Sequence, residues 1–245
     1  MVDRAGAYRE RPSRLDGAVV WTRTVLADDR DPVLPDGSID LLWREGTLLV
    51  AGPDTGPHHP HAPSGTRFAG VRFAPGSAPE LLGVPARELR DLRVELSDLW
   101  PAATVRALTA RVDAAADPAA GLEAVALRRA AELGRPDPLP RLIVAELAAG
   151  ASVATAAERI GIGARALHRR SLTAFGYGPK TLASILRMRR GLDAARAGMP
   201  LAAAAAHAGY SDQAHFTREV ARLAGRPPAA LLGRSSGARA QPSGA

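Results

Sequence analysis

The feature that most constrains this chain is an internal duplication in its C-terminal part. Residues 156–179 and 204–228 share one pattern of glycine, apolar and basic positions. Gly161 matches Gly209 at an offset of 48 residues, and the offset becomes 49 after a one-residue insertion. The positions that match at 49 are Leu167 with Phe216, Arg169 with Arg218, Gly176 with Gly225 and Pro179 with Pro228. A repeat of this size indicates that one supersecondary unit occurs twice.

Each copy has the order of a helix-turn-helix. A short Ala-rich helix comes first, because small side chains let a second helix lie close. Gly161 and Gly209 then end this helix in the left-handed conformation. Two residues later stands a cap position, which is Ser211 or Asp212 in the second copy and the weaker Gly163 in the first. The next helix has an apolar anchor and a polar face. Two such units in register predict an all-α double helix-turn-helix.

A helix is also predicted between the two copies, over residues 179–197. Proline suits the first turn of a helix, and Gly198 ends this one. Its apolar stripe consists of Leu182, Ile185, Leu186, Met188 and Leu192. At 1.5 Å per residue the helix spans roughly 28 Å, which is close to the roughly 34 Å of one DNA turn.

Charge divides the chain in the same place. Residues 1–138 hold 17 Arg against 20 Asp and Glu, a net charge of −3, whereas residues 139–234 carry a net charge of +9. A basic half joined to a mildly acidic half indicates a module that binds a polyanion, attached to something else. Nearly all of the positive charge is Arg, whose planar guanidinium suits phosphates and guanine edges.

Composition limits the remaining classes. The chain has no Cys, which removes disulfides and thiol catalysis and fits a reducing cytoplasm. The N-terminus has no apolar signal-peptide core, and no run of 18 apolar residues is present, so a cytoplasmic protein without a membrane span is expected. Aromatic residues make up only 4%, which favours a core of closely packed helices.

The N-terminal half has strand patterns first and helical patterns later. Strands are predicted over residues 18–26, 38–43, 47–50 and 67–73, and residues 52–65 are a loop rich in Gly, Pro and His. Helices are predicted over 104–115 and 118–133. Residues 134–138 are the predicted linker, and the Ser, Gly, Ala and Pro of 235–245 predict a disordered tail.

Residues 139–233 resemble the AraC family of transcription activators. Residues 209–219 with 225–228 are similar to the signature of the second unit, and residues 176–180 with 187–190 are similar to the helix between the units. The departures are Ser171, where the family usually has an aromatic core residue, and Gly163 in place of Ser. The resemblance implies these DNA-binding residues: Arg165, His168, Arg169, Gln213, His215, Thr217 and Arg218. For His215 a packing role stays equally open, and His207 fits a surface or packing role.

The N-terminal half resembles the degenerate cupin-like sensor domains of this family, on residues 35–43, 50–53, 70–76 and 81–85. The resemblance implies a small β-barrel followed by helices that often dimerise. The expected class is therefore α+β with two domains: a cupin-like sensor at 1–134 and an AraC-type double helix-turn-helix at 139–234. The implied partners are double-stranded DNA, RNA polymerase, a small-molecule effector and a second copy of the chain.

Two other functions compete with a transcription regulator. One is an enzyme in which His58, His59 and His61 hold a metal, as His-x-His does in cupins. The segment is a Pro-rich loop and the next acidic residue is Glu80, so neither a metal nor a cofactor is expected, and the chain is not predicted to be an enzyme. The other is a non-specific architectural DNA binder, although Gln213 and His215 favour base reading.

One group of N-terminal side chains has two interpretations. Asp36, Asp40, Trp43 and Arg72 line an effector pocket in one of them. In the other, they are turn caps and barrel core.

Overall fold

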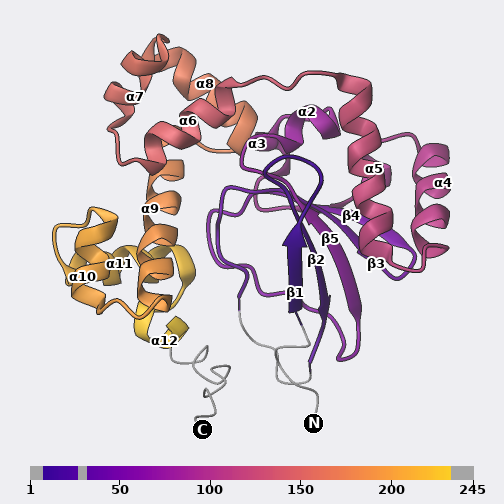
Figure 1. Cartoon of the computed structure of the whole chain (residues 1–245), viewed down its shortest axis with the longest axis horizontal. Helices are drawn as coiled ribbons and strands as arrows, with labels where there is room; N and C mark the ends of the chain where they lie inside the picture. Colours follow the sequence, from indigo (N-terminus) through magenta and orange to yellow (C-terminus); the bar gives the residue numbers. More distant parts are fainter. Residues whose placement is uncertain (1–7, 27–31, 233–245) are drawn as a thin grey trace, which may run out of the picture.

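The computed structural model describes residues 8–26 and 32–232 and has two parts joined by a short connection (Figure 1). A β-sheet covered by helices forms the N-terminal part, and the described C-terminal part is helical. The predicted α+β class with two domains is confirmed. The predicted tail at 235–245 lies outside the described residues.

The strands form one antiparallel sheet in the order β1-β2-β5-β3-β4-β6. Their bounds are β1 Tyr8–Pro12, β2 Val19–Thr24, β3 Asp40–Arg44, β4 Thr47–Ala51, β5 Arg67–Arg72 and β6 Arg93–Glu95. The turn between β3 and β4 uses Glu45 and Gly46, both with positive φ. In the described part of the chain the edge strands β1 and β6 do not pair with each other, so the sheet stays open instead of closing into the small barrel expected from the resemblance.

One face of the sheet makes the N-terminal core. Val20 pairs with Val71, and Val71 with Leu41, so these side chains point to the same face. Helix α5 covers that face and contributes Leu122 and Val125 to the core. The helices of this part are α2 Ala78–Leu82, α3 Ala86–Leu89, α4 Ala102–Asp113 and α5 Pro118–Leu133. The register and the apolar alternation together fix which face is buried.

The four predicted strands and two predicted helices are present, with ends that shift by a few residues. The strands at each edge of the sheet, β1 and β6, were not predicted. Every residue of β1 is exposed, so its sequence lacks the apolar alternation of a half-buried strand. β6 has only three residues, which is too short for any periodicity.

A buried carboxylate holds β1 and the following turn on α5. Glu123 is 2% exposed and accepts hydrogen bonds from Arg11 Nη2 at 2.9 Å, Ser13 Oγ at 2.8 Å and the Arg14 amide at 2.7 Å. The hydrogen bond from Arg11 is the main reason that the pKa of Glu123 falls to about 2. The ionised form is therefore favoured by the fold.

Glu123→Gln is expected to lower the free energy of unfolding at pH 7 by about 2–3 kcal/mol. The pKa is lowered in the folded state, so this stability is present above the unfolded pKa near 4.5 and is lost as the pH falls toward 2. Urea unfolding followed by circular dichroism should show a smaller difference between parent and variant at pH 3 than at pH 7. Glu132→Gln, at an exposed position of the same helix, should change little. Equal effects of the two substitutions would contradict the prediction.

The C-terminal helices share one core. They are α6 Leu139–Ala148, α7 Val153–Ile160, α8 Ala164–Phe175, α9 Pro179–Arg196, α10 Leu201–Ala208, α11 Gln213–Ala224 and α12 Pro228–Leu232. Leu167 of α8 and Phe216 of α11 belong to a single hydrophobic cluster with Ile185, Met188 and Leu192 of α9. Both repeat copies are thus packed on the same helix.

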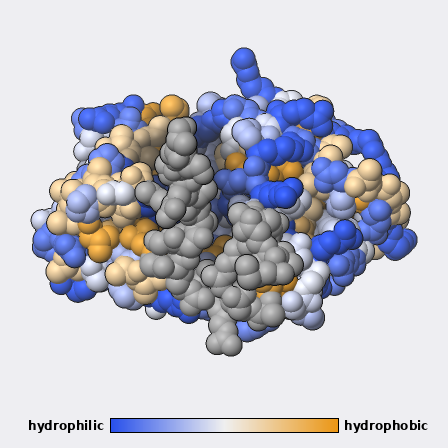
Figure 2. Space-filling model, turned by 60° about the horizontal axis from the view of Figure 1, so that its bottom comes forward, coloured by the Kyte–Doolittle hydropathy of each residue, from blue (hydrophilic) through white to orange (hydrophobic). Residues whose placement is uncertain are grey.

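No helix among the described residues is both long and apolar enough to cross a membrane. On the face displayed in Figure 2, strongly hydrophobic residues lie in small separate groups among hydrophilic ones.

Candidate nucleic-acid interface

The first helix-turn-helix is made by α7 and α8, and α6 packs against both, so these three helices form the first unit. Ser152 caps α7 by accepting a hydrogen bond from the Thr155 amide, and Gly161 ends it with a φ of 79°. Gly163 is the N-cap of α8 and offers no side-chain cap, as its sequence predicts. The left-handed turn and the extended residue that follows it place α8 across α7.

The second helix-turn-helix is made by α10 and α11. Gly209 ends α10 with a φ of 84°. Asp212 is the N-cap of α11, and its Oδ1 accepts a hydrogen bond from the His215 amide at 2.7 Å. The same hydrogen bond lowers the pKa of the Asp212 carboxyl. The second recognition helix therefore begins with a stronger cap than the first.

Four of the predicted DNA-binding side chains are exposed in the first half of a recognition helix. Arg165 and Arg169 lie on α8, and Gln213 and Arg218 lie on α11. His168 is also exposed, but it lies against the start of α9, where a Cβ at Gly178 would be 3.1 Å from its Nε2. The remaining two predicted residues are half-buried.

His215 and Thr217 are those half-buried residues. The His215 ring meets the Tyr210 ring edge-on, with centroids 5.1 Å apart, and its Nδ1 lies 3.2 Å from Ser211 Oγ. Packing, one of the two roles left open for His215, is thus observed.

A polar cluster under α11 was not predicted. Arg187 of α9 makes an ion pair of 2.8 Å with Glu219 and stacks 4.6 Å from the Tyr210 ring centroid. The Tyr210 hydroxyl donates to Glu219 at 3.0 Å. Burial and the neighbouring Glu219 raise the pKa of Tyr210. The cluster fixes the second recognition helix on α9.

Arg190 joins the two units directly. Its Nη1 donates to the carbonyl of Ala148, the last residue of α6, at 2.6 Å. Its Nη2 donates to the carbonyl of Ala208, the last residue of α10, at 2.7 Å. One guanidinium thus caps the C-terminal ends of a helix in each unit, where a positive charge is favoured. The next residue, Gly191, leaves room for Phe216, since a Cβ there would be 2.7 Å from the ring.

Ser171, the departure from the family pattern, lies in the core of the first unit. It is fully buried, and its Oγ has no hydrogen-bond partner within residues 8–26 and 32–232. An unpaired buried hydroxyl costs about 1–3 kcal/mol. The first unit is therefore less stable than a version with an apolar residue here.

Ser171→Ala is expected to raise the free energy of unfolding by about 1 kcal/mol, because it removes the unpaired hydroxyl and leaves only a small void. Urea unfolding of the whole chain would measure the difference. The exposed Ser97→Ala is the control and should have little effect. A destabilised Ser171→Ala variant would mean that the hydroxyl has a partner in solution.

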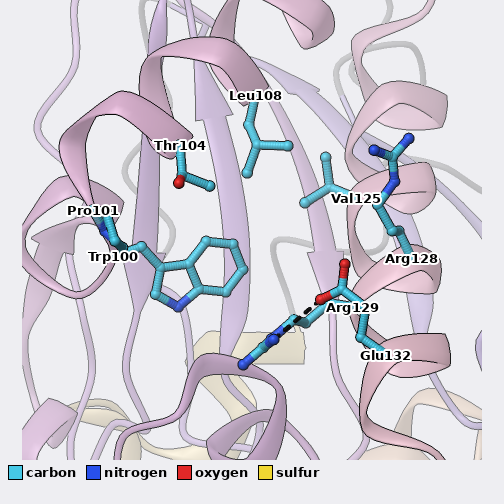
Figure 3. A pocket seen from close by; sticks show the side chains of 8 residues that line it. All are labelled: Trp100, Pro101, Thr104, Leu108, Val125, Arg128, Arg129 and Glu132. Carbon is cyan, nitrogen blue, oxygen red and sulfur yellow. Dashed lines mark hydrogen bonds and ion pairs between the residues drawn. The ribbon is translucent and has the colours of Figure 1, made fainter.

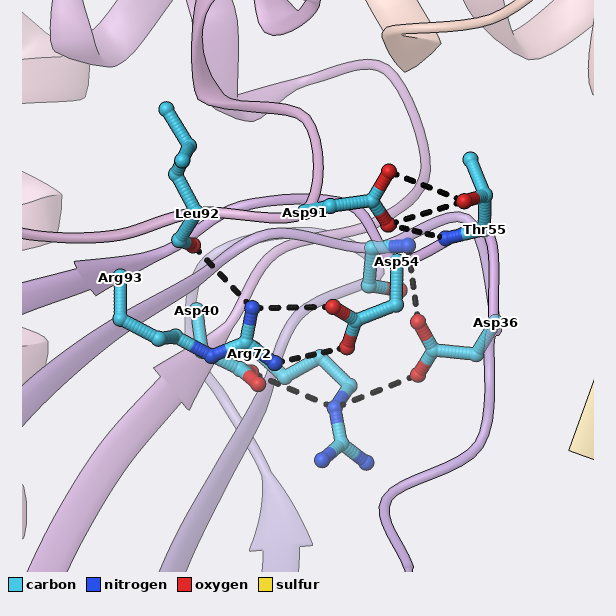
Figure 4. A network of polar contacts seen from close by, with 9 residues as sticks. Asp36, Asp40, Asp54, Thr55, Arg72, Asp91, Leu92 and Arg93 are labelled. Carbon is cyan, nitrogen blue, oxygen red and sulfur yellow. Dashed lines mark hydrogen bonds and ion pairs between the residues drawn. The ribbon is translucent and has the colours of Figure 1, made fainter. Parts of the chain in front are cut away.

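Three of the four side chains proposed for an N-terminal pocket do come together. Arg72 Nε lies 3.4 Å from Asp36 and 3.2 Å from Asp40 (Figure 4). Burial raises the pKa of Asp40 to about 6, although Arg72 opposes that shift. Trp43 is on the other face of the sheet, in the core, and donates to Asp113. Trp43 therefore fits the second interpretation, a core residue, and does not line a pocket with the other three.

The histidine segment forms no metal cluster in the described residues, where no group of three or more His, Cys, Asp or Glu could hold an ion. His58 forms an isolated β-bridge with Val33, and burial lowers its pKa. His207 is exposed on α10.

A separate hollow lies between α4 and α5 (Figure 3). Its volume is about 320 Å³, and Trp100, Leu108 and Val125 form its apolar wall. Arg129 lies over the Trp100 ring at 5.7 Å and pairs with Glu132 at 3.1 Å. The hollow can accept a small apolar group.

The fold and these two units define a class, the helix-turn-helix transcription regulators. More particularly, residues 156–234 match a family model described as "Helix-turn-helix domain", and this domain is of the AraC type, as the sequence resemblance indicated. Residues 18–95 match a model described as "Domain of unknown function (DUF6597)". AraC-type regulators are not enzymes, so the match disfavours the enzyme alternative. Among curated proteins, none matches the chain.

Solved structures resemble the chain distantly. A probable AraC family transcriptional regulator from Rhodopseudomonas palustris CGA009 is 22% identical over 39% of this chain and 94% of that one, with a TM-score of 0.34. An apo ToxT variant from Vibrio cholerae is 10% identical over 92% and 99%, with a TM-score of 0.49. ToxT with a bound unsaturated fatty acid is 11% identical over 91% and 97%, with a TM-score of 0.47. All three TM-scores lie below 0.5, and the assignment rests on the family match.

Proposed function

We propose that this regulator binds DNA sequence-specifically and reads two adjacent major grooves with α8 and α11. The observation that carries this proposal is the fusion of both units on α9, with a single core and with Arg190 bonded to each unit. Since α9 is a continuous helix of 18 residues, the recognition helices cannot change their spacing independently.

The side chains assigned to DNA are Arg165, His168 and Arg169 of the first unit, and Gln213, His215, Thr217 and Arg218 of the second. In this proposal Arg165 and Gln213 reach base edges from the first turn of each recognition helix. Arg169 and Arg218 lie further along and contact phosphate as well as base. His215 contacts DNA from the same helix and also packs on Tyr210. The first unit, with Gly163 and Ser171, binds DNA more weakly than the second.

For the N-terminal domain we propose a controlling role, through a small-molecule effector or through a second copy of the chain. We place the boundary between the domains at residues 134–138 in this proposal, and the presence of two hydrophobic cores supports it. Recruitment of RNA polymerase follows from the same class of function and would be tested separately.

The test of the proposed function is selection of binding sites by the full chain from random duplex DNA, followed by affinity measurements at several salt concentrations. We expect an enriched site with two short conserved segments about one helical turn apart. Affinity should fall steeply with salt, because neutralised phosphates release counterions. Strong binding without any enriched sequence would instead identify a non-specific architectural binder.

Gln213→Ala is expected to change the sequence preference of the protein, whereas Arg218→Ala is expected to lower its affinity for DNA in general. Loss of the Gln213 amide should relax the preference at one base pair, at a cost of about 1–3 kcal/mol on the preferred site. Loss of Arg218 should weaken binding to most sequences and reduce the salt dependence. Repeating the site selection with each variant measures both effects. Identical sequence profiles for the parent and Gln213→Ala would remove Gln213 from the base-reading set.

A further inference from the structure

The N-terminal domain lies directly on the helix that joins the two recognition units (Figure 1). Arg189 of α9 reaches across and pairs with Asp36 at 3.0 Å. Asp36 stands in the turn before β3, where its Oδ1 also accepts from the Ser38 amide at 2.8 Å. A cleft of about 620 Å³ runs along this contact, lined by residues of both domains that include Arg72, Arg189 and Asp36.

The charges of the contact balance only when both domains are present. On the sheet, Asp36 and Asp40 share the single guanidinium of Arg72 (Figure 4). The side chains of Asp36, Asp40 and Arg72 are only 14%, 15% and 25% exposed. Two carboxylates and one guanidinium leave one uncompensated negative charge in a partly buried position, and this is costly. Arg189 supplies the missing positive charge.

Other contacts between the domains lie beside this ion pair. Leu34 of the N-terminal domain packs against the C-terminal core, and a Cβ at Gly37 would be 3.4 Å from Leu182 and 3.6 Å from the Tyr177 hydroxyl. Further along, Arg90 donates to the Gly176 carbonyl at 3.5 Å. The ion pair itself is partly open to solvent, since the Asp36 side chain is 14% exposed and the Arg189 side chain is 44% exposed.

The contact leaves the predicted DNA side chains uncovered. With the N-terminal domain in place, Arg165, Arg169, Gln213 and Arg218 are all exposed. The N-terminal domain therefore occupies the part of α9 and the end of α8 that lie away from these side chains. Separation of the domains is not required to expose the recognition helices.

We propose that Asp36 and Arg189 form an interdomain latch, which completes the charge balance of the Asp36–Arg72–Asp40 cluster and holds the N-terminal domain on α9. The latch rests on the proposed function in one respect, because that function makes α9 the helix between two DNA-binding units. The latch links the sheet around Arg72 directly to α9, and α3 contacts the end of α8 separately through Arg87 and Arg90.

The test measures the distance between the domains in the full chain. Because the sequence has no Cys, Ser97→Cys and Ala203→Cys, both at exposed positions, would carry two spin labels without background. Arg189→Gln and Asp36→Asn should each shift the equilibrium toward separated domains by about two- to fivefold, which is seen as a second, longer distance. The double variant should show no more separation than either single variant, because both remove the same pair.

Arg196→Gln is the matched control, since Arg196 lies on the same helix and, among the described residues, pairs with the exposed Asp193. It should keep the parent distance. The latch is overturned if Arg189→Gln behaves like Arg196→Gln, or if the effects of Asp36→Asn and Arg189→Gln simply add. Circular dichroism and thermal melts would establish that each variant is folded. Failure of the parent to select a DNA site would overturn the proposed function and leave this distance measurement valid.

Discussion

Moving the two contacted segments of the operator apart by about five base pairs is expected to lower the affinity of the full chain by about 100-fold. Five base pairs are about half a helical turn, so the second segment would face the opposite side of the duplex. The units cannot follow it, because α9 is continuous and Arg190 is bonded to the ends of both α6 and α10. The remaining affinity should approach that for a duplex with a single contacted segment.

The measurement compares duplexes that differ only in spacing, so the protein is unchanged throughout. A duplex with one segment scrambled gives the affinity of a single contact and serves as the reference. The first unit has Gly163, which offers no side-chain cap, and the buried Ser171. Scrambling the DNA segment of the first unit should therefore lower the affinity less than scrambling the segment of the second unit. Equal affinity at both spacings would show that the two units move independently, against the shared core.

Phe216→Ala is expected to lower the free energy of unfolding of the C-terminal domain by about 3–5 kcal/mol. The ring is fully buried, lies 5.0 Å from the Tyr210 ring and fills the space left by Gly191. Removing it leaves a cavity beneath α11, so the second recognition helix should lose its fixed position. DNA affinity should fall together with stability.

Leu142→Ala is the control for this substitution, because Leu142 is a large apolar residue of the same domain that is 51% exposed. It should change stability by well under 1 kcal/mol. Urea unfolding and DNA binding measured on both variants separate the two effects. Normal stability with lost DNA binding in Phe216→Ala would mean that Phe216 contacts DNA and is not a core anchor.

Local features of this protein were determined by the sequence alone. Gly161 and Gly209 predicted left-handed helix ends, and Asp212 predicted a capped recognition helix, because each of these depends on a few neighbouring residues. The repeat likewise predicted two units, since a duplication places the same local rules in the chain twice. The charge split pointed to a polyanion for the same part of the chain.

Tertiary structure decided how distant residues meet. In the sequence, Arg190 is one of several basic residues on a predicted helix. In the structure it lies between the ends of α6 and α10 and donates hydrogen bonds to both. Glu123 and Arg11 are separated by 112 positions, so no local pattern indicates their ion pair. Trp43 and Arg72 lie in the paired strands β3 and β5, but the pleat sends their side chains to opposite faces.

The contact between the domains likewise could not be predicted from the sequence. Asp36 predicts a turn cap, and it does accept from the Ser38 amide, but the same carboxylate also binds Arg189 of α9. Sequence patterns report the period and capping of each element. They do not report which surfaces of two domains are complementary, because that depends on long-range packing and on desolvation of charges that lie far apart in the chain.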